Sequence, residues 1–154
     1  MVDTVGGEAG VALKQSDLVG TYKLSKVLRE IVATGEVKDM TGANGHGRVM
    51  YGPDGNMMVL INYDGRPQAD RVEDLTDEDR VKLFKTTIAY GGKYRIDGNQ
   101  VSHDIEISWN DVWTGNTVVR EIRRDGDKMI YIAHPSTASD TGEIIVTGLL
   151  WEKL

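Results

Sequence analysis

Asp-Gly turns between segments of alternating polar and apolar residues constrain the fold of this chain most strongly. Asp97-Gly98-Asn99 and Asp125-Gly126-Asp127 are two such turns, and Gly52-Pro53-Asp54-Gly55 is a third turn of related chemistry. Asp-Gly between alternating segments is among the strongest short-range signals for a β-hairpin. The three predicted hairpins pair residues 48–51 with 56–63, 93–96 with 100–108, and 117–124 with 128–134.

Further strands are predicted over residues 18–32, 36–40 and 143–151. Eight or nine strands in succession favour a closed antiparallel barrel, because closure removes exposed sheet edges. The 154 residues are enough for one domain with a sizeable core. We therefore predict an all-β barrel of eight to nine strands over residues 16–154. The Gly-rich residues 1–15 lack periodicity, and we expect them to form a mobile N-terminal segment with at most a short helical turn.

One helix is expected to interrupt the strands. Thr76 can cap it, and the three acidic residues that follow place negative charge at the positive end of the helix dipole. Val81, Phe84 and Ile88 then give an apolar stripe at helical spacing. Gly91-Gly92 is expected to stop the helix. Such a helix could lie across a barrel mouth or plug its end.

The composition argues against several classes of protein. A net charge of −6 disfavours nucleic acid as a partner, because phosphate backbones repel an acidic domain. The absence of cysteine excludes disulfides, thiolate zinc sites and a cysteine nucleophile, and the three histidines are far apart in sequence, so no metal site is expected. The N-terminus lacks a signal-peptide pattern and no apolar stretch is long enough to cross a bilayer. We expect a cytoplasmic protein with no membrane partner.

Strand alternation identifies the residues that face the barrel interior. Over residues 100–108, the side chains of Val101, Ile105 and Ile107 share one face, and His103 lies with them. Opposed residues of an antiparallel hairpin point the same way, so Tyr94 joins this face.

The next hairpin allows two registers, and both give mixed faces, so alternation alone leaves the choice open. One register turns inward Val118, Arg120, Ile122, Met129, Tyr131 and Ala133; the other turns inward Val119, Glu121, Ile130 and Ile132. Under the first register, Tyr94, His103, Arg120 and Tyr131 lie among apolar side chains. A mostly apolar cavity with a few convergent polar groups is typical of a small-molecule site.

Five segments resemble the bacterial and fungal lipocalin-like domain family, a group of small intracellular calycin-type barrels. They are 18–22, 51–55, 89–98, 101–106 and 150–152, which follow one another in the expected order. Tyr22 stands where the family usually has Trp, and Asp104 stands where a second His is frequent. The resemblance implies a barrel that holds a hydrophobic ligand. The family's spacing also supports the register that turns Arg120 and Tyr131 inward.

The first functional hypothesis is an enzyme that uses no cofactor. His103 and Tyr94 would transfer a proton on an apolar or aromatic substrate in an isomerisation, cyclisation or elimination. Arg120 or Tyr131 would bind or polarise an oxygen. The other predicted ligand-binding residues are Met57, Ile61, Ile105 and Trp113.

The alternatives are a passive carrier or sensor of a hydrophobic molecule and, ranked last, a haem-type binder with His103 as proximal ligand. His103 could also be a core histidine bonded to Tyr94, and Arg120 could stack on Tyr22 at the closed end of the barrel. The oligomeric state, a homodimer included, stays open.

Overall fold

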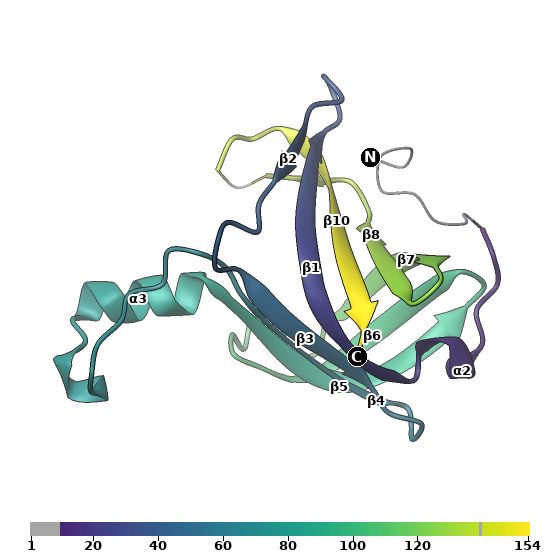
Figure 1. The fold of residues 1–154 in the computed structure, drawn as a ribbon, viewed down its shortest axis with the longest axis horizontal. Coiled ribbons are helices and arrows are strands. Elements are labelled where there is room, and N and C mark those ends of the chain that lie inside the picture. The colour runs from purple at the N-terminus through teal and green to yellow at the C-terminus, as the bar shows by residue number, and fades with distance from the viewer. Residues whose placement is uncertain (1–9, 139) are drawn as a thin grey trace.

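The computed structural model describes residues 10–138 and 140–154 (Figure 1). Its strands form one antiparallel sheet in the order β2-β1-β3-β4-β5-β6-β7-β8-β10-β9, and an additional pairing of β1 with β10 closes eight of them into a barrel. The barrel strands are β1 (Gly20–Ile31), β3 (His46–Tyr51), β4 (Asn56–Asn62), β5 (Thr87–Asp97), β6 (Gln100–Ser108), β7 (Thr117–Asp125), β8 (Lys128–Ala133) and β10 (Ile144–Lys153). The predicted all-β barrel is confirmed.

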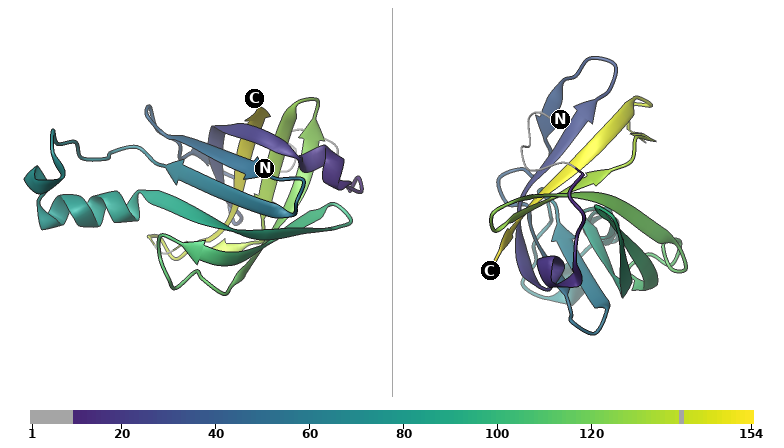
Figure 2. Two further views of the ribbon diagram at one scale, coloured as in Figure 1. Left: turned by 90° about the horizontal axis from the view of Figure 1, so that it is seen from below. Right: turned by 90° about the vertical axis from the view of Figure 1, so that its right-hand side faces the viewer.

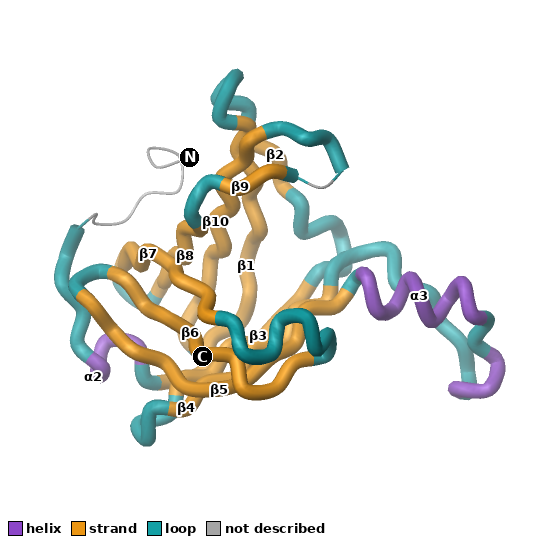
Figure 3. Tube along the Cα trace, turned by 180° about the vertical axis from the view of Figure 1, so that it is seen from behind, coloured by secondary structure: helices purple, strands orange, loops and turns teal. Residues whose placement is uncertain are grey.

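The remaining elements are short and lie outside the closed ring of strands. They are α2 (Gln15–Leu18), β2 (Val37–Asp39), a 3-10 turn at Val72–Asp74, α3 (Asp77–Lys85) and β9 (Ser136–Thr137). The tube in Figure 3 shows how the strands enclose a common interior while α3 stands apart. Within the described part of the chain, no helix is long and apolar enough to span a membrane.

The β7–β8 hairpin adopts the register that turns Arg120 inward. Arg120 pairs with Ala133, and Ile122 pairs with Tyr131. Ile122, Met129 and Tyr131 are buried in one core cluster. The structure thus settles the choice that alternation alone left open, in the direction that the family spacing supports.

A β-bulge between β5 and β6 overturns the prediction for Ile107. Gly91 pairs with Ile107 whereas Gly92 pairs with Ile105, so Glu106 is an extra residue in β6. One extra residue reverses the facing of every side chain beyond it, and Ile107 is 67% exposed. A Cβ on Gly92 would clash with the Asp104 carbonyl oxygen. Only glycine therefore fits the bulge.

Helix α3 begins as predicted and then departs from the prediction. The Asp79 N–H donates to the Thr76 hydroxyl, and the Thr76 N–H donates to the Asp79 carboxylate. The helix ends at Lys85, and Gly91-Gly92 belongs to β5 instead. No residue of α3 is buried, and Figure 2 (left) shows the helix extending away from the barrel. It neither crosses the mouth nor plugs an end, because its stripe loses Ile88 to β5.

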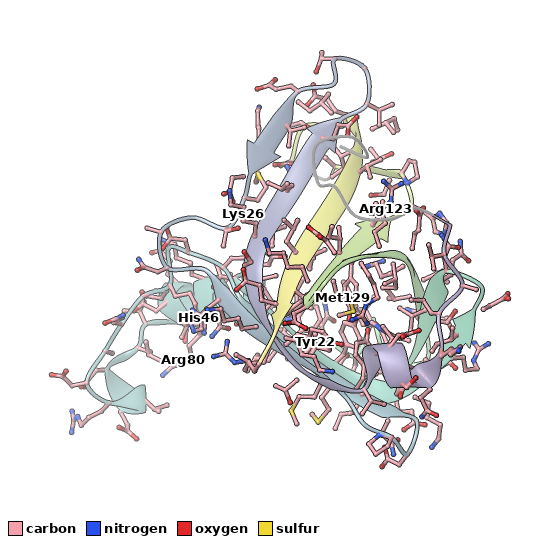
Figure 4. All side chains as sticks on the ribbon, turned by 45° about the vertical axis from the view of Figure 1, so that its right-hand side comes forward. Tyr22, Lys26, His46, Arg80, Arg123 and Met129 are labelled. Atoms are coloured by element: carbon pink, nitrogen blue, oxygen red, sulfur yellow. The ribbon has the colours of Figure 1, made fainter. Side chains whose placement is uncertain are left out.

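Residues 10–18 cover one end of the barrel, which we call the closed end. Leu18 is fully buried in the core, and the Leu13 N–H donates to the Gly98 carbonyl. Gln15 donates from its side chain to the Pro53 carbonyl. Of the segment predicted to be mobile, residues 1–9 lie outside the described residues. Figure 4 shows Tyr22 inside the barrel near this end.

Candidate functional site

A cavity of about 560 Å³ opens at the end of the barrel opposite α2. The walls come from β4, β5, β7, β8 and β10 and from the loops beside them. Most wall side chains are apolar, and these include Val59, Ile61, Ile88, Val118 and Leu149. The polar groups on the wall include Tyr63, Tyr90, Arg120, Tyr131 and His134.

The structure brings together four of the six predicted ligand-binding residues. Arg120, Tyr131, Ile61 and Trp113 line the cavity. Met57 and Ile105 lie on the inner face as well, in the packed core, but they do not line the cavity. They flank Gly92 in the sheet, on the closed-end side of the cavity. Alternation identifies inward residues but does not show how far along the barrel the cavity reaches.

His103 does not line the cavity, and its side chain is fully buried inside the barrel. Its Nε2 is 2.6 Å from the Tyr51 hydroxyl, and its Nδ1 is 2.8 Å from the Tyr90 hydroxyl. The Tyr51 hydroxyl is also hydrogen-bonded to the Tyr131 hydroxyl. Both ring nitrogens are therefore taken by tyrosines, and two of the three tyrosines reach the cavity.

Tyr94, predicted to act with His103, has other partners. It stands opposite His103 in the sheet, as expected. However, its hydroxyl donates to the Gly52 carbonyl at 2.7 Å and accepts from the Gln15 side chain at 3.2 Å. The predicted Tyr94–His103 contact is thus replaced by bonds from Tyr51 and Tyr90. Continuing the alternation from Tyr94 would have turned Tyr90 inward as well.

Burial keeps this cluster uncharged. Desolvation, together with the positive charge of Arg120, lowers the pKa of His103 to about 3. Desolvation raises the pKa of Tyr90 to about 12 and raises the pKa values of Tyr51 and Tyr131 well above their usual range. Near neutral pH the ring is a neutral imidazole between neutral hydroxyls. It holds one N–H donor and one acceptor nitrogen.

Arg120 places a positive charge on the cavity wall. Among the described residues its guanidinium donates to the Val119 carbonyl at 3.1 Å. Its charge acts on Tyr63, Tyr90 and Tyr131, whose pKa values it lowers against the effect of burial. An arginine offers five N–H donors, so donors remain for a ligand.

Arg120 does not occupy the alternative place that the sequence suggested for it. Tyr22 is at the closed end, and Arg124 is the arginine whose charge lowers its pKa against desolvation. Arg120 therefore does not stack on Tyr22 at the closed end of this barrel.

Comparison with known families agrees with the barrel and its cavity. The family model for the lipocalin-like domain matches residues 19–154. The chain belongs to the lipocalin-like domain family. A search of curated proteins gives no match for the chain. Membership of a lipocalin-like family fits binding of a small hydrophobic ligand and, because one fold serves many functions, does not choose between a carrier and an enzyme.

Neither metal nor haem binding gains support from this lipocalin-like site. Within residues 10–138 and 140–154, no group of three or more His, Cys, Asp or Glu side chains could hold a metal ion. His103 is separated from the cavity by Tyr90 and Tyr131, and both of its nitrogens are hydrogen-bonded. His103, the suggested haem ligand, therefore does not face the cavity where a haem would bind.

Proposed function

We propose that this barrel binds a small, largely apolar molecule in its open-end cavity and is a cofactor-independent enzyme that moves a proton on that molecule. One observation carries the proposal. The guanidinium of Arg120 and the hydroxyl-bearing side chains of Tyr90 and Tyr131 line one otherwise largely apolar cavity. Convergent polar groups in an apolar pocket fix the orientation of a ligand.

The cavity supports the binding part of the proposal. Its volume of about 560 Å³ lies within the usual range for small-molecule sites. The apolar wall suits an aromatic or alicyclic body. Arg120 suits an oxygen that carries negative charge, such as a carboxylate or an enolate.

The polar groups support the catalytic part. When the substrate loses a proton, negative charge develops on one of its oxygens. A fixed guanidinium in a partly enclosed site stabilises such charge. The hydroxyls of Tyr90 and Tyr131 are neutral. The Tyr90 hydroxyl is positioned by its hydrogen bond to His103, and the Tyr131 hydroxyl by its hydrogen bond to Tyr51, which in turn bonds to His103. Isomerisation, cyclisation and elimination all use these steps.

A non-catalytic carrier or sensor is the second candidate. It is favoured by one observation: His103, the predicted base, is fully buried and does not line the cavity. A carrier needs only the apolar wall and Arg120.

Native mass spectrometry of protein purified gently from its own source tests the proposal. We expect a mass excess from a small molecule that is chemically altered on incubation with the protein. Arg120→Gln should lower the occupancy, whereas Arg71→Gln, at an exposed ion pair with Asp74, should not. A bound molecule that returns unaltered would support the carrier, and an unoccupied protein that binds no member of an aromatic carboxylate panel would contradict both candidates.

A further inference from the structure

Four buried side chains form one continuous hydrogen-bonded chain with both ends on the cavity. Tyr131 bonds to Tyr51, Tyr51 bonds to His103 Nε2, and His103 Nδ1 bonds to Tyr90. Tyr131 and Tyr90 line the cavity, whereas Tyr51 and His103 do not. We call this set the tyrosine–histidine chain. It lies inside the barrel on the closed-end side of the cavity and joins Tyr131 of β8 to Tyr90 of β5.

Counting donors shows that the chain has a direction. A neutral imidazole carries one N–H, so one ring nitrogen donates and the other accepts. If Nδ1 donates to Tyr90, then Tyr51 donates to Nε2 and Tyr131 donates to Tyr51, which leaves the Tyr90 proton free for the cavity. If Nε2 donates to Tyr51, then Tyr51 donates to Tyr131 and Tyr90 donates to Nδ1, which leaves the Tyr131 proton free. In either direction one cavity end donates and the other accepts.

We propose that the tyrosine–histidine chain is a reversible proton relay between two parts of the cavity wall, and that its substrate is an enolisable carbonyl compound with an apolar body. This inference rests on the proposed function and names its substrate class. A molecule bound across Tyr90 and Tyr131 receives a proton at one end and loses one at the other. Its reaction is an internal proton shift.

The transfer balances without an added reagent. With the Tyr90 proton free, Tyr90 gives it to the carbonyl oxygen, and each later member of the chain passes its proton one place toward Tyr90. Tyr131 then takes a proton from the carbon next to the carbonyl. A C–H bond breaks, an O–H bond forms, and the electron pair of the C–H bond becomes part of the enol double bond. The chain ends in its opposite direction, and the reverse transfer or exchange with water resets it.

Burial favours this relay over a stepwise transfer. A stepwise path would charge His103 or a tyrosine in an apolar interior, and desolvation opposes both. A concerted shift leaves every member neutral. The positive charge of Arg120 can stabilise the substrate oxygen as the proton moves.

Tyr51 offers the sharpest test, because it belongs to the chain but not to the cavity wall. Tyr51→Phe removes the link between Tyr131 and His103 and leaves the wall unchanged. Tyr22→Phe is the matched control, since Tyr22 is equally buried and its hydroxyl donates to the Leu18 carbonyl. The probe is the keto–enol interconversion of phenylpyruvate, followed by ultraviolet absorbance.

We expect wild-type protein to accelerate this interconversion and Tyr51→Phe to lower kcat by at least about 100-fold, the lower part of the range for general acid–base catalysis. The dissociation constant of phenylpyruvate should change by less than about threefold, because the cavity wall is intact. Tyr22→Phe should keep both values. If Tyr51→Phe retains the wild-type kcat, the relay is wrong while the proposed enzyme stands.

A second measurement tests the relay even where no turnover occurs. NMR of isotopically labelled histidine distinguishes the protonated from the unprotonated ring nitrogen. We expect the His103 tautomer to differ between complexes with a phenol, which can donate, and acetophenone, which only accepts. This difference should vanish when Tyr51→Phe and Tyr90→Phe are combined, because both ring nitrogens then lose their hydroxyl partners. If wild-type protein binds these probes but turns over nothing, the proposed catalysis fails, and a tautomer that depends on the probe still supports the coupling. One fixed tautomer in all complexes would overturn the relay.

Discussion

The two ends of the barrel use buried tyrosines in different ways. At the closed end, the hydroxyls of Tyr22 and Tyr94 donate to the backbone carbonyls of Leu18 and Gly52. Toward the open end, Tyr90 bonds directly to His103, and Tyr131 is connected to His103 through Tyr51. All four are almost fully buried, at 0–7% exposed. The hydrogen-bond partner, and not burial, separates the two groups.

This difference separates tyrosines that hold the fold from tyrosines that serve the cavity. The closed-end hydroxyls bond only to groups of the closed end, which are backbone carbonyls and, for Tyr94, the Gln15 side chain, so their loss affects local contacts. The hydroxyls of Tyr90 and Tyr131, at the two ends of the tyrosine–histidine chain, each have one side-chain partner, and both residues line the cavity. Such a group keeps hydrogen-bonding capacity for a ligand, since a hydroxyl offers one donor and two acceptor lone pairs.

The bulge at Gly92 lies between the two regions, and breaking it should have the largest effect. A Cβ at this position clashes with backbone, so we expect Gly92→Ala to lower the free energy of unfolding by about 3 kcal/mol or more. Gly91→Ala is the control, because its Cβ would lie 3.1 Å from the flexible Met58 side chain and 3.2 Å from the Met57 carbonyl oxygen, far less close than the 1.9 Å contact at Gly92. Urea unfolding measures both, and equal stability of the two variants would contradict the account of the bulge.

Removing one hydroxyl from each region should lower the free energy of unfolding by different amounts. Tyr90→Phe leaves the buried Nδ1 of His103 without its partner, and we expect a loss of about 2 kcal/mol in unfolding free energy. Tyr22→Phe should cost about 1 kcal/mol, the net value of one hydrogen bond. Denaturant midpoints of the two variants decide the order. A larger loss for Tyr22→Phe would mean that the closed end, not the chain, holds the more demanding polar group.

The chain should also make stability depend on pH. His103 has a pKa of about 3 in the folded protein and about 6.5 when exposed, so between these values the unfolded chain binds a proton that the folded chain does not. The free energy of unfolding is therefore independent of His103 titration above pH 6.5. Below that pH it decreases as the pH falls toward 3, with a slope that approaches ~1.4 kcal/mol per pH unit. His103→Gln should remove this slope, and the exposed His46→Gln should keep it. An unchanged slope in His103→Gln would show that His103 is protonated in the folded state.

Much of the closed end, and part of the open end, follows from the sequence. The Asp-Gly turns and strict alternation predict the hairpins and place His103 and Tyr94 inside. They predict the Ile107 side chain wrongly because the bulge depends on a close backbone approach between Gly92 and Asp104, which only the folded sheet contains. The hydrogen-bond partners of the tyrosine hydroxyls are still less predictable from the sequence. Tyr94 and Tyr90 lie on the same face of β5, yet one bonds to a turn and the other to His103, and alternation cannot tell them apart.

The most direct test of the open-end site is a calorimetric titration with two matched ligands, naphthoate and its uncharged counterpart naphthamide. We expect wild-type protein to bind naphthoate at least about tenfold more tightly, a difference of about 1.4 kcal/mol, because Arg120 faces the carboxylate. Arg120→Gln should reduce that ratio to about one without changing the unfolding midpoint. Equal affinities in wild-type protein, or no binding of either ligand, would contradict an apolar cavity organised around Arg120.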